Sequence, residues 1–174
     1  MNVIITAIGG KDRPGIIAAL TRAVVEVGGN LDDATMTRLR GAFANMLAAV
    51  LPDGCTIADL EARLAPVSAD LDLHVAVYDL PADEPEEESA DHVISVYGAD
   101  HPGIVHEITS LLAQCGANIT DLNTRVAGLP GQPIYVMLLE TAGGDWQRLL
   151  PILESAGKKL GVDVSVREID AETL

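Results

Sequence analysis

The alternation of apolar and polar positions divides the chain into short elements, and the same order of elements occurs twice. Residues 3–8 alternate loosely and are rich in β-branched side chains, which indicates a strand. Apolar residues then recur at helical spacing and predict a helix with one buried face: Ile16, Leu20, Val24 and Val27. The pair Gly28–Gly29 that follows is typical of a helix C-cap. The counterpart stripe in the second half is Ile104, Ile108, Leu112 and Cys115, and Gly116 closes it.

Two further strand candidates follow each of these helices and predict a hairpin. In the first half they cover residues 31–39 and 42–51 and turn near Arg40–Gly41. In the second half they cover residues 119–126 and 134–140 and turn through residues 128–131.

A second helix and a last strand complete each half. Thr56 with Asp59 resembles a capping box that opens one helix, and Asp145 is a suitable N-cap for the other. Pro66 and Pro151 fall inside these helices, and we expect them to bend or break the helix because proline lacks the backbone N–H. The last strands are predicted at residues 73–78 and 162–169.

The resulting order is strand, helix, strand, strand, helix, strand in each half. This order is that of the ferredoxin-like βαββαβ unit. We therefore predict an α+β protein of two such modules in tandem, each an antiparallel sheet with two helices on one face.

Identical residues at a constant spacing support the duplication. Asp12–Ile16 (DRPGI) returns as Asp100–Ile104 (DHPGI), 88 positions later. The same spacing relates Gly10 to Gly98, Thr21 to Thr109, Gly28 to Gly116, Asn30 to Asn118 and Asp33 to Asp121. Towards the end of each copy the spacing becomes 89, which a short insertion in the middle of the second copy would explain.

A proline-containing acidic run separates the two halves. Residues 81–90 include two prolines and five acidic residues, and like charges keep such a run extended. We expect a solvated linker between domains at residues 1–80 and 91–174.

Composition narrows the functional classes. The chain of 174 residues is 48% hydrophobic but only 3% aromatic, so its cores must be largely aliphatic. A net charge of −15 argues against direct nucleic-acid binding, which needs cations to neutralise phosphates. The start of the chain lacks a secretion signal, and no apolar segment reaches membrane-spanning length, so we expect a cytoplasmic protein without membrane contact.

The cysteines and the tryptophan suggest structural roles. Cys55 and Cys115 are far apart and lack a CxxC partner, and Cys115 falls on the apolar side of its helix. A buried free thiol is therefore expected at Cys115. Trp146, near a helix start, is interpreted as a packing residue.

The repeated DxPG loop, with the glycine-asparagine turn after each first helix, carries a resemblance to a known family. The chain resembles the ACT domain family, small modules that commonly bind amino acids and regulate an attached protein. A tandem pair resembles the glycine cleavage system transcriptional repressor family. The resemblance covers nearly the whole chain except the acidic linker and the tail.

The resemblance implies a non-enzymatic regulatory protein with a small amino acid of the glycine or serine class as effector. It would form homo-oligomers, need no cofactor and act on transcription through a DNA-binding regulator or another protein. Effectors of such pairs typically lie between two modules, contacted by the loop and by the asparagine. The residues carried over are Asp12, Arg13, Pro14, Gly15, Ile16, Asn30, Asp100, His101, Pro102, Gly103, Ile104 and Asn118.

Elementary chemistry is consistent with that assignment. A helix N-terminus presents unpaired N–H groups and suits a carboxylate, and the glycines Gly15 and Gly103 leave room for a ligand to approach. Asp12 or Asp100 could pair with an ammonium group. The same residues also serve ordinary turns and caps. Arg13 against His101 indicates that the two loops have diverged, which argues against two equivalent sites and leaves open whether one or both loops bind.

Other classes stay open at this stage. The copies could be a ligand-free dimerisation scaffold, or an acylphosphatase-like hydrolase with Arg13 holding a phosphate. Formyltetrahydrofolate deformylase also begins with an ACT-like module, but no formyl-transfer domain follows in this sequence. His101 and His106 are interpreted as solvent-facing rather than metal-binding, since no set at ligand spacing accompanies them.

Overall fold

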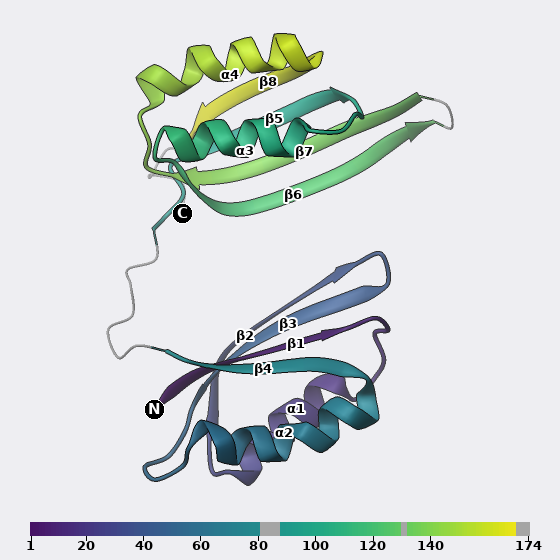
Figure 1. The fold of residues 1–174 in the computed structure, drawn as a ribbon, viewed down its shortest axis with the longest axis vertical. Helices are drawn as coiled ribbons and strands as arrows, with labels where there is room; N and C mark the ends of the chain where they lie inside the picture. Colours follow the sequence, from purple (N-terminus) through teal and green to yellow (C-terminus); the bar gives the residue numbers. More distant parts are fainter. Residues whose placement is uncertain (81–87, 130–131, 170–174) are drawn as a thin grey trace. The chain divides into compact units, whose positions relative to one another are not determined.

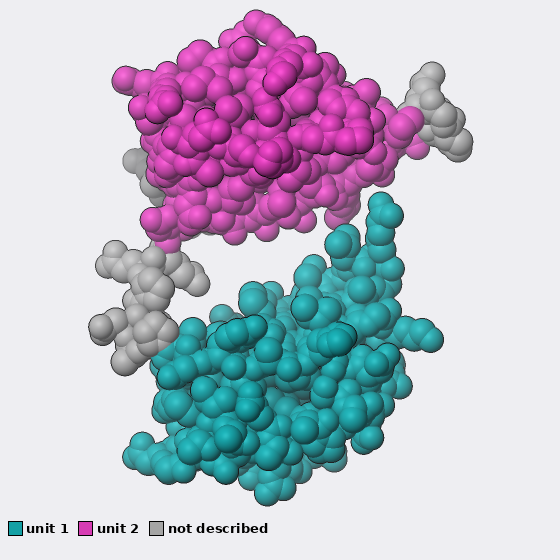
Figure 2. Space-filling model, viewed as in Figure 1, with its two compact units in different colours: residues 1–85 teal, residues 86–174 magenta. Residues whose placement is uncertain are grey.

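The computed structural model describes residues 1–80, 88–129 and 132–169. The chain divides into two compact units, Met1–Pro85 and Glu86–Leu174, which we call the first and second module (Figure 2). Residues 81–87 of the expected linker and residues 130–131 of the expected hairpin turn lie outside the described residues.

Each module has the predicted βαββαβ order. The first contains β1 (Asn2–Gly9), α1 (Ile16–Glu26), β2 (Asn30–Leu39), β3 (Ala42–Val50), α2 (Ile57–Leu71) and β4 (Leu73–Asp79). The second contains β5 (His92–Ala99), α3 (Ile104–Gln114), β6 (Asn118–Leu129), β7 (Gln132–Ala142), α4 (Trp146–Leu160) and β8 (Val162–Glu168). The antiparallel sheets have the orders β2-β3-β1-β4 and β6-β7-β5-β8, with two helices on one face (Figure 1). The predicted fold is confirmed.

Two separate aliphatic cores lie between the sheets and the helices. In β1, Val3, Ile5 and Ala7 face the helices and are fully buried. The stripe on α1 meets them, with Ile16, Leu20 and Val24 among its buried residues. A second, also largely aliphatic cluster fills the second module and includes Cys115, a buried free thiol as expected.

The starts of α2 and α4 are capped by side chains, as predicted. The Asp59 N–H donates to Thr56 Oγ1 at 3.2 Å, and the Thr56 N–H donates to Asp59 Oδ2 at 2.9 Å, which completes the capping box. Asp145 Oδ1 accepts from the Arg148 N–H at 3.2 Å.

Both prolines are accommodated within continuous helices. Pro66 lies inside α2 and Pro151 inside α4, and neither helix is interrupted. The expectation that they break the helix is wrong, because each costs one backbone hydrogen bond while buried leucines on the same helix hold it against the sheet. Those leucines are Leu60, Leu64, Leu149 and Leu153.

The sheet register corrects one pair of the repeat. Gly98 lies between Tyr135 and Val162, and the residue between the equivalent Phe43 and Leu73 is Gly9, not Gly10. A Cβ on Gly9 would lie 2.6 Å from Phe43 Cε1, and one on Gly98 would lie 2.8 Å from Val162 Cγ1. A Cβ on Gly10 would meet nothing within 4 Å. The first module therefore has one additional residue in its loop, and the pairing of Gly10 with Gly98 in the repeat is wrong by one position.

The change of spacing along the repeat also has more than one source. The hairpin runs from Asn30 to Val50 in the first module and from Asn118 to Ala142 in the second, where it is four residues longer. The connection to the second helix is then shorter in the second module. The single insertion expected from the sequence is thus wrong, because a longer hairpin and a shorter loop largely cancel.

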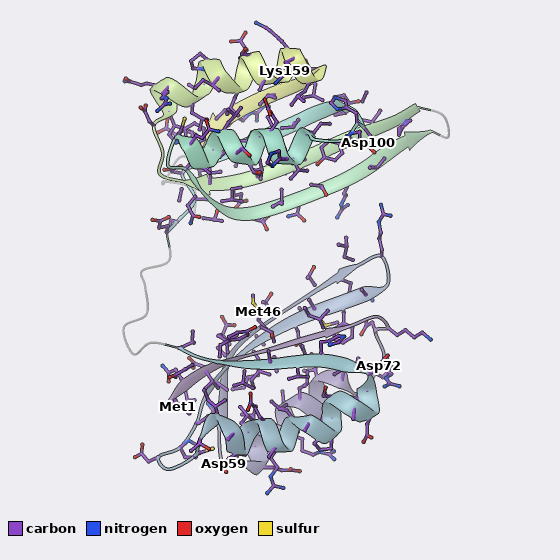
Figure 3. The ribbon with its side chains drawn as sticks, viewed as in Figure 1. Met1, Met46, Asp59, Asp72, Asp100 and Lys159 are labelled. Atoms are coloured by element: carbon purple, nitrogen blue, oxygen red, sulfur yellow. The ribbon has the colours of Figure 1, made fainter. Side chains whose placement is uncertain are left out.

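The sheet face opposite the helices carries exposed apolar side chains in the first module. Ile8, Met46 and Tyr78 are each about half exposed there, and Figure 3 labels Met46. Within the described ranges, every helix is too short or too polar to cross a membrane.

Candidate functional site

The two DxPG loops join the first strand of each module to its first helix. Gly15 and Gly103 are the N-cap residues of α1 and α3, with φ values of 97° and 100°. This left-handed conformation strains any residue with a side chain, so glycine is required at both positions. A Cβ at either glycine would meet nothing within 4 Å, which leaves the start of each helix open to approach.

The same two helices lack a side-chain cap. Neither Gly15 nor Gly103 supplies one, and no side-chain cap bond is made at either helix start. In contrast, Thr56 and Asp145 cap α2 and α4. The first-turn N–H groups of α1 and α3 are therefore available to an anion.

The remaining loop residues divide into exposed and buried ones. Pro14 and Pro102 are exposed and stiffen their turns. The Ile16 and Ile104 side chains are 3% and 2% exposed and belong to the cores, so these residues offer a ligand only their backbone.

Arg13 and His101 occupy matching positions, and each donates a hydrogen bond to a carbonyl oxygen near the end of the second helix of its module. Arg13 Nη2 donates to the Asp70 carbonyl oxygen at 3.0 Å, in the last turn of α2. His101 Nε2 donates to the carbonyl oxygen of Leu160, the last residue of α4. Each side chain thus ties its loop to the C-terminal end of the second helix, where the helix dipole favours a cation.

The expectation of a solvent-facing histidine pair is wrong for His101. Its ring is half-buried against α4, because the loop turns it towards the Leu160 carbonyl. His106 is exposed on α3, as predicted. In the part of the chain that the structure describes, no three His, Cys, Asp or Glu residues group as a metal site.

The aspartates of the two loops have different surroundings. Asp12 Oδ2 accepts from Arg38 Nη1 of β2 at 3.4 Å. Arg38 pairs with Phe43 across the hairpin, and the equivalent pair in the second module is Val126 with Tyr135. Asp100 consequently has no such cation at the matching position of β6.

Tyr135 places a buried hydroxyl group in the second module. Its side chain is 7% exposed, and the hydroxyl has no hydrogen-bond partner among the described residues. Burial and the nearby negative charge of Asp100 raise the pKa of Tyr135. The Thr124 side chain lowers this pKa in part, although its position relative to the Tyr135 hydroxyl does not meet the geometry of a hydrogen bond.

The two asparagines lie far from the loops of their own modules. Asn30 pairs with Val50 at one end of the sheet, whereas Arg38, beside the DxPG loop, lies at the other end. Strand length separates these ends by roughly 20 Å. A strand followed by a helix returns the chain to the opposite end, and that topology could have revealed the separation from the sequence. Asn118 occupies the equivalent end of the second module and donates through Nδ2 to Glu88 Oε2 at 3.2 Å.

A depression of about 360 Å³ adjoins the first loop on its α2 side. Its lining residues are Gly10, Lys11, Arg13, Leu71 and Asp72. Figure 3 labels Asp72, the last of these. Gly10 and Lys11, the two residues between Gly9 and Asp12 where the second loop has only one, both line this depression.

Sequence reasoning missed a polar cluster at the opposite end of the second module. Asp91 Oδ1 lies 2.7 Å from His92 Nδ1, and Asp91 Oδ2 accepts from the Gly143 N–H at 2.8 Å. Trp146 Nε1 donates to the Gly143 carbonyl oxygen at 2.8 Å, and its indole also packs against the core, as predicted. The adjacent Asp91–His92 pair in the sequence was the available signal.

Fold and loops together define a class: tandem ferredoxin-like modules whose first helices begin at an open, glycine-capped loop. A family model described as ACT domain matches residues 2–78 and 91–167. The chain therefore belongs to the ACT domain family.

Relatives of known sequence match one module's length. A UPF0237 protein of Methanopyrus kandleri is 42% identical over 80 residues, which cover 45% of this chain and 87% of the relative. The glycine cleavage system transcriptional repressor of Escherichia coli is 36% identical over 74 residues, covering 42% of this chain and 36% of that protein. The sequence resemblance to this repressor family is thereby confirmed as a distant similarity.

Solved structures match the whole chain in fold. A protein of unknown function from Galdieria sulphuraria has a TM-score of 0.79 and 22% identity, with 97% of this chain and 98% of that one covered. A structure titled as a candidate glycine cleavage system transcriptional repressor has a TM-score of 0.70 and 20% identity, with 97% of both chains covered.

Proposed function

We propose that the chain is a non-enzymatic regulatory protein that binds a small amino acid and alters the activity of another protein. The single observation that supports this most is the contrast between helix starts. α2 and α4 are capped by their own side chains, whereas α1 and α3 begin at open glycines without a cap. Uncapped N–H groups suit the carboxylate that every free amino acid carries.

The candidate ligand residues are the two loops with Asn30 and Asn118. Because each asparagine lies at the other end of its own sheet, a ligand that contacts both a loop and an asparagine requires residues from two copies of the module. This requirement gives binding a route to regulation, since a ligand favours whichever arrangement of modules it contacts best.

Regulation of transcription through a protein contact is the proposed biological role. The similarity to the Escherichia coli repressor supports it, and the net charge of −15 favours a protein partner over DNA. The Arg13 guanidinium bonds to the Asp70 carbonyl, so the group that an acylphosphatase-like reaction would need is already engaged.

The test is a calorimetric titration and thermal-shift series with glycine, L-serine and the other protein amino acids. We expect saturable binding by at least one small amino acid and an increase in Tm that follows its concentration. Absence of binding across the series would contradict the sensor role. A pull-down from the native host with and without the ligand would then identify the protein partner.

A further inference from the structure

The charge balance of the two DxPG loops differs at one matched strand position. Arg38 on β2 forms an ion pair with Asp12, with N and O atoms 3.4 Å apart. The second module has Val126 at the position of Arg38, and its side chain is 53% exposed. The matching strand position therefore offers Asp100 no cation. Figure 3 labels Asp100 at the connection between β5 and α3.

The neighbouring strand position differs in the same direction. Phe43 is a 2% exposed apolar core residue in the first module. Tyr135 takes its place in the second and adds a hydroxyl group that is buried and without a hydrogen-bond partner among the described residues. An unsatisfied buried hydroxyl costs free energy, which a ligand or a bridging group can recover.

We propose that the loop of the second module alone binds the small amino acid. The loop of the first module binds no ligand and has only a structural role, through the contacts of Arg13 and Asp12. This inference rests on the proposed function and deepens it. Asp100 accepts hydrogen bonds from the ligand ammonium, and the first-turn N–H groups of α3 after Gly103 bind its carboxylate. The Tyr135 hydroxyl, for which the described residues supply no hydrogen-bond partner, lies buried at the same end of the sheet.

The first loop is unsuited to the same ligand because its acid is already paired. An ammonium group approaching Asp12 would have to displace the guanidinium of Arg38 or share the carboxylate with it. Arg13 and Lys11 add two more positive charges around this loop. The second loop carries His101 alone, and its ring is turned to the Leu160 carbonyl.

A calorimetric titration with glycine and L-serine on matched variants tests the assignment. Wild-type protein is expected to bind one ligand per chain. Asp100→Asn should weaken binding roughly 10- to 100-fold, as expected for loss of a charge-assisted hydrogen bond. Asp163→Asn removes the same charge from an exposed position of β8 and should leave binding unchanged.

Exchange of the matched strand residues gives the reciprocal test. Val126→Arg introduces the cation of the first module at an exposed position and should weaken binding to a similar extent. The double change R38V with F43Y gives Asp12 the two strand neighbours that Asp100 has, while Lys11 and Arg13 stay in place, and should produce measurable binding at the first loop in addition to the second. Circular dichroism and Tm of every variant establish that it is folded.

The outcomes separate the two proposals. Two equivalent sites in the wild type, or loss of binding in Asp12→Asn but not in Asp100→Asn, would overturn the assignment and leave the sensor role intact. No binding of any amino acid by the folded wild type would overturn both. Weakened binding of N-acetylglycine, in which the ammonium is blocked, would support the role of Asp100.

Discussion

The imidazole ring of His92 lies stacked on the indole of Trp146, with centroids 3.8 Å apart and planes 18° from parallel. Trp146 is the single tryptophan of the chain, so its fluorescence reports on the surroundings of this ring. Removal of the stacked imidazole in His92→Ala exposes one face of the indole to water and should shift the Trp146 emission to longer wavelength. Emission spectra of wild type and His92→Ala at one pH check this. Identical spectra of the two folded proteins would contradict the expectation.

Asp91 should make the stability of the second module depend on acid. Burial opposes ionisation of this carboxyl, but hydrogen bonds from His92 and the Gly143 N–H outweigh it and lower the pKa of Asp91. A lowered native-state pKa stabilises the fold at neutral pH, and this contribution is lost as the pH falls through the lowered value. Urea unfolding should show that Asp91→Asn is less stable than wild type at pH 7.

The difference between Asp91→Asn and wild type should shrink as the solution is acidified. We expect the effect to be small, because the Asp91 side chain is 45% exposed and is screened by solvent. A difference that stays constant from pH 7 to strongly acidic solution would show that the amide disrupts packing instead of removing a charge.

Gly9 and Gly98 should tolerate no side chain. Alanine at either position places a Cβ within 3 Å of a core side chain, and overpacking of this kind costs about 1–3 kcal/mol. Gly10→Ala is the matched control, since its Cβ would meet nothing, and it should leave the free energy of unfolding nearly unchanged. Equal destabilisation by Gly9→Ala and Gly10→Ala would contradict the register.

Asn45 should be replaceable by an apolar residue with a gain in stability. Its side chain is 2% exposed, and neither amide atom has a hydrogen-bond partner among the described residues. Asn45 pairs with Ala7 of β1, and the matching residue of the second module is the buried Met137, which pairs with Val96. Asn45→Leu removes the desolvation penalty and should stabilise the protein by about 1 kcal/mol or more.

Chemical denaturation of Asn45→Leu measures this gain. If the variant is less stable although it is folded, the Asn45 amide has a partner in solution that stabilises it. Met137→Leu is the control for the effect of side-chain shape at the matching site.

The order of elements followed from the sequence because burial imposes a period on each of them. Val3, Ile5 and Ala7 repeat every second residue, and Ile16, Leu20 and Val24 repeat every fourth, so strand and helix are distinguishable without tertiary information. Caps such as Thr56 with Asp59 are equally local. The DxPG motif likewise marked the loops correctly as turns before a helix.

The contacts around the candidate site were not predictable in the same way. The Asp12–Arg38 pair joins residues on different elements, and the role of Tyr135 depends on which residue lies opposite it. Both require the strand register, and matching of the repeated motif placed that register one residue off at Gly10. The surroundings of His101 were also not predictable, because its partner, Leu160, is distant in the sequence.

A hydrogen bond joins each DxPG loop to the C-terminal end of the second helix of its module, so a movement of the loop affects that helix end. Because one hydrogen bond joins His101 to the terminal carbonyl of α4, a movement of the loop that breaks it leaves that carbonyl without this partner. Lys158 and Lys159, the latter labelled in Figure 3, lie in the same turn, and Lys159 pairs with Glu107 of α3 at 3.1 Å. A displacement at the loop therefore acts directly on the turn of α4 that carries these two lysines.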